Sequence, residues 1–453
     1  MRRIFPRLVA GMLAGALGPV EALAEQVPAA PEAALAPEGA EEQGWLTHRL
    51  ELINELTLAG ERDSRFNPEG ELLDFESRVN ALRLNGEFGA RLPADLRLKG
   101  QVSSALRTGR ETTSAVSLRE LYATASLGDF ELSAGRRILK WTNGYAFNPA
   151  GLLEPQRSPS DPQDRLKLLQ GREMLQLDYF AGDHTFTAVF STDALTAEDD
   201  DGLADRYDLA LRANVLVTSW NLDLAAVALV SNIKNMGALS FSYVLGDALE
   251  LHGEVSGSRG SGAEYPRIIL PENQQRFFLR DYLGRVKQDE TRLFLRYVVG
   301  VNYTLPMGTT LIGEFFHSDD GLSSEEWVRF ITHADFSRDQ MATGHHPRIF
   351  GGRSLPELSL LQGLGRLSIQ NIRRNYVFLR DSQTWLADRV GASALALVNL
   401  DDPSAAFVGE GSYLIRRGAT VYARASVLTG DAWSEFGNLG QRASLNVGAV
   451  LSF

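Results

Sequence analysis

The chain has 453 residues, with 45 basic and 57 acidic side chains and no cysteine, which gives a formal net charge of −12. The lack of cysteine excludes disulfides, thiolate zinc sites, iron–sulfur clusters and cysteine nucleophiles. The acidic balance argues against a general nucleic-acid binder, which would carry a basic face. Mean hydropathy is −0.14, and no apolar run reaches the roughly 18 residues that a membrane-spanning helix needs.

The first 24 residues have the pattern of a secretory signal peptide. A basic start with Arg2, Arg3 and Arg7 precedes a largely apolar stretch over 8–20 and an A-x-A cleavage site that ends at Ala24. The alternative reading is a short amphipathic N-terminal helix. We expect residues 1–24 to be a signal peptide that is removed on export.

Residues 25–44 are dominated by Ala, Pro and Glu, and contain no large apolar side chains beyond Val27 and Leu35. Such a segment cannot bury enough surface to order itself. We expect it to form a short disordered tail in the periplasm, ahead of a single folded unit over 45–453.

From Trp45 to the end, apolar and polar residues alternate, which is the period of a strand. In 292–305 every odd position is apolar or aromatic, and the same holds in 442–453. Tight turns such as Gly128-Asp129 join some strands, and long polar segments join the others. Short turns that alternate with long loops are typical of an outer-membrane barrel.

The pattern predicts an all-β protein, a transmembrane antiparallel barrel of about 18 strands, with 16 as the lower bound. An even number places both termini on the periplasmic side. The expected strands are 46–58, 76–91, 96–106, 116–127, 130–140, 174–181, 185–192, 206–216, 220–231, 236–245, 248–258, 292–304, 309–317, 374–381, 389–400, 405–415, 419–428 and 442–453. The expected long connections are 61–74, 107–115, 141–172, 193–205, 259–290, 318–372 and 429–441.

Aromatic residues give an independent check on this register. Phe130, Trp220, Tyr243, Tyr303 and Phe453 all fall on the apolar face, next to short turns or to the C-terminus. A periplasmic girdle of aromatic side chains is expected at that level of a barrel.

The last strand carries Leu445, Val447, Ala449, Leu451 and Phe453 at two-residue steps. It resembles the C-terminal signal strand of Gram-negative outer-membrane barrel proteins, and the layout of the folded part resembles porin-like members of that group. The resemblance implies a location in the outer membrane, contact with its lipid and insertion by the barrel-assembly machinery. A secreted sandwich or propeller would also alternate, but the terminal phenylalanine, the loop lengths and the polar second face favour the barrel.

In a barrel of 16–18 strands the polar faces line a lumen wide enough for water. Charges of both signs are spread over these faces. The candidate wall residues are Arg49, Arg97, Lys99, Arg137, Arg212, Arg292, Arg296 and Arg424 among the cations, and Glu120, Glu254 and Glu314 among the anions. The arginines either guide anionic solutes or pair with facing carboxylates and serve only the wall.

The loop 141–172 contains four prolines, so its backbone is stiff. With the preceding Gly135-Arg136-Arg137 it resembles a stretch found in porin-like proteins of the exporter and uptake type. We expect it either to fold inward and narrow the pore or to form a rigid outer cap. The candidate constriction residues are Trp141, Tyr145, Phe147, Asn148 and Pro149.

The connection 318–372 is too long to lack structure of its own. Ser323 and Glu326 form a capping-box start for a helix, and 355–369 is a second apolar-rich stretch. The two readings are a folded lid or plug and a loop packed on its neighbours.

The sequence contains little that suggests catalysis or metal binding. His317-Ser318 faintly resembles the His-x-Ser-Asn-Gly run of outer-membrane phospholipases, but Asp320 stands where that motif has asparagine. We read the acidic run 198–201 as solvated and His345-His346 as weak evidence for a metal. We expect no enzyme, no cofactor and no nucleic-acid partner.

The sequence thus predicts a channel through which small hydrophilic solutes, or an exported polymer, pass a hydrated and charged lumen. The alternative is a closed barrel that serves as a surface-interaction or scaffold protein. These readings are separated by whether the long loops 141–172 and 318–372 fill the lumen. The oligomeric state stays open.

Overall fold

The computed structural model describes residues 45–73, 75–93, 96–162, 168–192, 206–261, 264–266, 285–287, 291–344, 348, 352–368 and 372–453. The expected signal peptide and tail, the acidic run 198–201 and His345-His346 lie outside the described residues.

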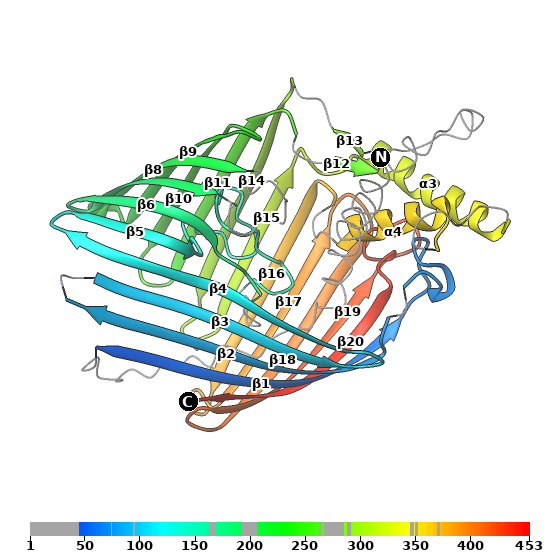
Figure 1. The fold of residues 1–453 in the computed structure, drawn as a ribbon, viewed down its shortest axis with the longest axis horizontal. Helices are drawn as coiled ribbons and strands as arrows, with labels where there is room; N and C mark the ends of the chain where they lie inside the picture. Colours follow the sequence, from blue (N-terminus) through cyan, green and yellow to red (C-terminus); the bar gives the residue numbers. More distant parts are fainter. Residues whose placement is uncertain are drawn as a thin grey trace, which may run out of the picture.

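Eighteen strands form one antiparallel sheet, and the sheet closes because the last strand pairs with the first (Figure 1). The prediction of an 18-stranded antiparallel barrel is confirmed. The strands are β1 (Leu46–Glu61), β2 (Arg78–Leu92), β3 (Leu96–Thr108), β4 (Thr112–Leu127), β5 (Phe130–Arg137), β6 (Arg172–Ala181), β7 (His184–Thr192), β8 (Tyr207–Val217), β9 (Leu222–Ser231), β10 (Met236–Leu245), β11 (Leu249–Arg259), β14 (Leu293–Thr304), β15 (Thr310–Ser318), β16 (Asn375–Trp385), β17 (Val390–Asn399), β18 (Ser404–Arg416), β19 (Ala419–Thr429) and β20 (Gln441–Ser452).

Four further elements lie in the long loops. The short strands β12 (Glu264–Pro266) and β13 (Arg285–Lys287) pair with each other, outside the barrel sheet. The helices α3 (Ser324–Ala342) and α4 (Leu355–Ser368) sit together beyond one end of the barrel (Figure 1). In the described part of the chain, no helix is long and apolar enough to cross a membrane.

One predicted long connection is wrong. The structure has strand where 107–115 was expected to be a loop, because β3 runs on to Thr108 and β4 begins at Thr112. The ladder continues there, with Thr108 opposite Thr112 and Leu106 opposite Ser114. Threonine and serine side chains read as loop-like in the sequence, yet threonine favours strands and both pair readily across a ladder.

The outer face of the barrel carries the apolar side chains. Leu445, Val447, Leu451 and Phe453 of the C-terminal run are exposed, and Phe453 is 74% exposed. The backbone of Phe453 exchanges two hydrogen bonds with Leu50 of β1, at 2.8 and 3.2 Å. The last residue of the chain therefore takes part in closing the barrel while its ring points outward.

The largest apolar core lies where the long loops meet the inner wall. It joins Trp327 and Phe330 of α3, several leucines of α4, Phe66 of the loop after β1 and Phe436 of the loop before β20 to wall residues such as Phe378. We refer to α3, α4 and the loop 430–440 together as the cap. Ser323 forms the predicted capping box at the start of α3: its hydroxyl accepts from the Glu326 amide (3.3 Å), and its own amide donates to the Glu326 carboxylate (2.8 Å).

Candidate functional site: an infolded loop against a charged wall

The connection between β5 and β6, described over 138–162 and 168–171, turns into the barrel. Its residues Ala146, Phe147, Ala150 and Leu153 are buried. The Phe147 ring stacks on Phe316 of β15, with ring centroids 4.4 Å apart. Because β15 lies across the sheet from β5, the loop reaches the opposite wall.

Two buried wall carboxylates hold the loop there by its backbone. Glu254 of β11 accepts hydrogen bonds from the amides of Asn143 (2.9 Å), Gly144 (2.7 Å) and Ala150 (3.0 Å). Charge-assisted bonds of this kind are stronger than neutral ones, so the loop backbone is fixed at β11.

Glu314 of β15 is the second of these carboxylates. It accepts hydrogen bonds from the amides of Tyr145 and Ala146 (2.9 Å for Ala146), and it lies 2.9 Å from Nε2 of His252. Together Glu254 and Glu314 supply acceptors for backbone groups that would otherwise be buried without partners.

The two ends of the loop are tied to other strands. The Ile138 amide donates to Glu120 of β4 (2.8 Å), and the Arg119 side chain donates to the Leu169 carbonyl (3.0 Å). Between them, Arg424 of β19 donates to the Ser160 carbonyl. The segment that leads to Ser160 therefore crosses the interior from the β11–β15 side to β19.

The loop also braces itself. The Glu154 carboxylate accepts from the Thr142 hydroxyl (2.7 Å), and Arg157 donates to the Thr142 carbonyl (3.1 Å). Asn148 bridges to Pro155 and Arg157, at 3.0 Å each. These bonds connect the two arms of the loop, so the loop has a defined internal structure.

The loop covers an apolar part of the inner wall. Leu139 and Leu153 form a buried cluster with wall residues of β6–β9, and Ala150 packs on Val227 and Ala238 of β9 and β10. These inward positions of the wall would otherwise face water in the lumen. Insertion of the loop buries them.

The cations predicted for β1 and β3 stay in contact with solvent. Their side chains point to the same face as buried polar groups such as Glu55 and Ser103, yet Arg97 is 52% and Lys99 47% exposed. Arg97 pairs with Glu131, and Lys99 lies 3.5 Å from Glu120. Inward-facing charges that remain half exposed are in contact with water at this end of the barrel.

Two more of the predicted wall cations contact fixed partners. Arg137 donates to Ser133 (3.1 Å) and lies over the Tyr122 ring, at 4.9 Å from its centroid. Arg212 lies over the Trp141 ring at 5.7 Å, and so faces the infolded loop.

The remaining cations lie in ion pairs. Arg424 lies 3.8 Å from Glu410. At the loop end of β14, Arg296 pairs with Asp320 (2.5 Å) and Arg292 with Asp319 (3.4 Å). Of the predicted cations, Arg97, Lys99 and Arg292 remain about half exposed even though each lies near a carboxylate.

The candidate constriction residues have different environments. Phe147 is buried in the apolar core, and Asn148 is used in bracing. Trp141, Tyr145 and Pro149 are half-buried, and Arg380 of β16 lies over the Tyr145 ring at 5.3 Å. Sequence reasoning missed Glu154 and Arg157, which lie outside the aromatic stretch that drew attention to this loop.

The His317-Ser318 pair does not have the geometry of a catalytic base and nucleophile. Adjacent residues of a strand point to opposite faces. His317 stacks on Tyr297 (5.0 Å) and bonds Asn375 (2.7 Å), whereas Ser318 is buried on the other face. Within the described residues, no group of three or more His, Asp or Glu is placed to hold a metal ion.

No protein-family model matches the chain, and no curated protein matches it in sequence. Solved structures are similar to it in fold. The crystal structure of OccAB1 from Acinetobacter baumannii has 10% sequence identity and a TM-score of 0.53, covering 92% of this chain and 99% of that chain. The crystal structure of OccK11 (OpdR) from Pseudomonas aeruginosa has 11% identity and a TM-score of 0.50, covering 90% and 96%. At this identity the similarity establishes the fold, and the chain is a closed, porin-like 18-stranded β-barrel.

Proposed function

We propose that the chain is an outer-membrane channel through which small hydrophilic solutes diffuse. One observation carries the proposal: inward-facing charges on β1 and β3 remain half exposed, while the loop between β5 and β6 covers the apolar part of the same inner wall. A wall divided in this way suits a narrowed, hydrated path and not a dry core. The fold supports the proposal, since the structural neighbours are Gram-negative outer-membrane porins of the OprD/Occ family.

We further propose that the path favours anions. A cavity of about 440 Å³ opens at the end of the barrel where β1 begins. Five cations and two carboxylates line it, namely Arg49, Arg91, Arg97, Lys99 and Arg137 against Glu87 and Glu131. An excess of positive charge at a constriction lowers the energy of a passing anion and raises that of a cation.

The second candidate is a closed barrel that acts as a surface-interaction protein. The apolar core of the cap favours it, because this core fills part of the loop end of the barrel on the side of β14–β18. The partner would then contact the outer surface of the cap.

For biogenesis, we propose that residues 1–24 direct export and are removed, and that residues 25–44 form a tail in the periplasm. The C-terminal run that ends at Phe453 would be recognised by the barrel-assembly machinery. Its exposed apolar side chains support this assignment, because a recognition signal has to be accessible.

The deciding experiment is conductance of the refolded mature chain in a planar bilayer with a salt gradient. Steady conductance with a reversal potential of the sign expected for anions supports both parts of the proposal. Steady conductance with a reversal potential of the opposite sign rejects anion selectivity but keeps the channel. No conductance from a correctly folded, inserted barrel rejects the channel in favour of the closed barrel.

The Lys99→Gln variant tests the role of the wall cations in the same assay. We expect the reversal potential to move toward that of an unselective pore, because one half-exposed lumen cation is lost and Glu120 loses its partner at 3.5 Å. Arg417→Gln is the matched control, since it removes the same charge from an exposed turn between β18 and β19. Equal shifts in both variants would contradict a specific role for the wall.

A further inference from the structure

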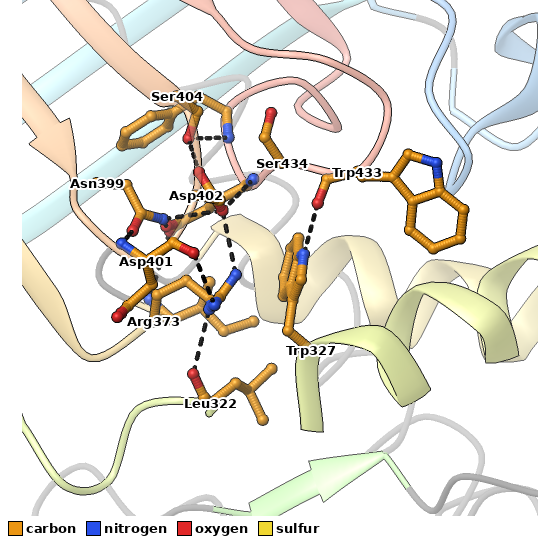
Figure 2. Close-up of polar contacts among 12 residues, drawn as sticks. Leu322, Trp327, Arg373, Asn399, Asp401, Asp402, Ser404, Trp433 and Ser434 are labelled. Atoms are coloured by element: carbon orange, nitrogen blue, oxygen red, sulfur yellow. Dashed lines mark hydrogen bonds and ion pairs between the residues drawn. The ribbon is translucent and has the colours of Figure 1, made fainter. Parts of the chain in front are cut away.

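The cap is attached to the wall through a buried polar cluster, part of which is shown in Figure 2. Arg373, two residues before β16, is 1% exposed and lies over the Trp327 ring of α3, at 4.9 Å from its centroid. Its guanidinium donates to the Leu322 carbonyl (3.1 Å) and to the Asp402 carboxylate (3.2 Å). The Trp327 indole in turn donates to the Trp433 carbonyl (2.6 Å). Helix α3, the wall and the loop 430–440 therefore meet at this cluster.

Two carboxylates share this site. Asp402, in the turn between β17 and β18, and Glu435, in the loop 430–440, both accept from the same Asn399 amide nitrogen, at 3.1 and 2.8 Å. The Glu435 backbone amide also donates to Asp402 (3.0 Å). Glu435 is 1% exposed, so neither water nor salt screens the two groups from each other.

The charges around Glu435 do not balance. From β16, the Tyr376 hydroxyl donates to its carboxylate (2.6 Å), and Arg373 is the cation beside the pair. Asp401 accepts from the amides of Arg374 and Asn375 at the edge of the cluster. One buried guanidinium thus faces two buried carboxylates.

Other charges near the cluster have partners of their own. Arg374 lies 3.6 Å from Glu326 of α3, and Arg62, from the loop after β1, donates to the Phe436 carbonyl (3.0 Å). A proton on one of the two carboxylates would neutralise the remaining charge, as in other buried carboxyl pairs.

We propose that Asp402 and Glu435 form a proton-operated attachment of the cap, which holds the cap against the wall when Glu435 is protonated and loosens it when both carboxylates are charged. This rests on the proposed function only in that a looser cap would widen the outer entrance of a channel. Burial, together with the charge of Asp402 and against the hydrogen bond from Tyr376, raises the pKa of the Glu435 carboxyl from its ordinary 4.5 to about 7. Burial also raises the pKa of Asp402.

The sign of the pH dependence follows from linkage. The docked cap binds a proton more tightly than the undocked cap, so docking is most favourable below pH 4.5 and weakens as the pH rises toward 7. Within that window the docked-to-undocked ratio falls by up to about tenfold per pH unit. Above that pH window the docked-to-undocked ratio no longer changes with pH.

The test measures the cap and the pore separately, on the full mature chain, between pH 5 and pH 8. Hydrogen exchange of the amides in α3 and in 430–440, corrected for the intrinsic pH dependence of exchange, reports docking. Single-channel conductance reports the entrance. We expect both to increase with pH in the unmodified chain. Exchange that depends on pH without any conductance rejects the channel and keeps the attachment, whereas corrected exchange that does not change between pH 5 and pH 8 overturns the attachment.

Three variants make the test specific. Glu435→Gln is permanently neutral, so we expect the cap to stay docked across the range. Tyr376→Phe removes a bond to the charged carboxylate, so the transition should move to higher pH, which a purely structural role would not produce. Glu325→Gln, on the exposed face of α3, is the matched control and should keep the pH profile of the unmodified chain. A profile of Glu435→Gln equal to that of the control overturns the proposal.

Discussion

Carboxylates of similar position on the inner wall have different roles that depend on what they face. Glu254 and Glu314 are buried and accept from the amides of the infolded loop. Glu131 instead pairs with the half-exposed Arg97. The first two hold the infolded loop in place, because a buried carboxylate with backbone donors fixes a chain segment, and the third partly neutralises Arg97.

The combined change Glu254→Gln and Glu314→Gln should loosen the infolded loop. Each glutamine side chain keeps one acceptor oxygen but has lost the negative charge. We expect this to weaken the contact with the loop by about 1–3 kcal/mol per site. We expect larger and noisier single-channel conductance, together with faster proteolysis within 138–162. Glu250→Gln is the control, because that carboxylate accepts hydrogen bonds from Ser242 and Asn302 of the wall and not from the loop backbone. If the control increases the conductance as much as the double change, the loop is not what narrows the pore.

For a single wall residue, the sequence predicts the face on which it lies but not its partner. Alternation assigns Glu254 to the inner face because its neighbours two positions away share that face. It gives no information on which loop amide will meet that carboxylate, since the contacts join β11 to a segment more than a hundred positions earlier. The exposed cations are different, because solvent contact needs no specific partner.

At the scale of elements, α3 is defined by a local signal. Ser323 and Glu326 cap its first turn reciprocally, and such a cap is recognisable in sequence because all of its atoms lie within four residues. What α3 packs on is not local: Trp327 contacts Trp433 and Arg373. The start of the helix was therefore predictable, whereas its position as part of a cap was left open between a lid and a surface loop.

Ser323→Ala should weaken the first turn of α3 without changing the barrel. Loss of an N-cap costs about 1 kcal/mol, so the amides of that turn should exchange about fivefold faster. Thr332→Ala is the control, because its exposed hydroxyl donates to the Val328 carbonyl one turn earlier and does not cap the helix start. Equal exchange rates in the two variants would show that packing alone holds the helix start.

At the scale of the whole molecule, closure of the sheet joins the two ends of the chain. β1 pairs with β20, and Phe453 lies opposite Leu50. Such pairing over the full length of the sequence closes the longest loop available to the chain, which makes it slow to form without assistance. The terminal residue is thus both part of the closing seam and an exposed aromatic group on the outer face.

Phe453→Ala should lower the amount of folded barrel recovered from membranes. The backbone bonds to Leu50 remain, but the exposed ring of the C-terminal run is lost. The folded fraction is measured by the shift in gel mobility between unheated and heated samples. Phe407→Ala is matched to it, since that phenylalanine is also exposed on the outer face, on β18. A similar loss in both variants would mean that lost apolar surface explains the effect.

The sequence alone determined the strand period, predicted about 18 strands and assigned most of the wall charges to the inner face. These follow from local rules, because side chains alternate strictly along a strand and tight turns have their own residues. The same rules failed at 107–115, where cross-strand pairing extended two strands through residues that resemble a loop. Tertiary structure decided that the β5–β6 loop folds inward, that Glu254 and Glu314 hold it, and that Asp402 and Glu435 meet beneath the cap. Those contacts depend on which segments, distant in the sequence, are brought together when the barrel closes. No local sequence pattern specifies which distant segments will meet.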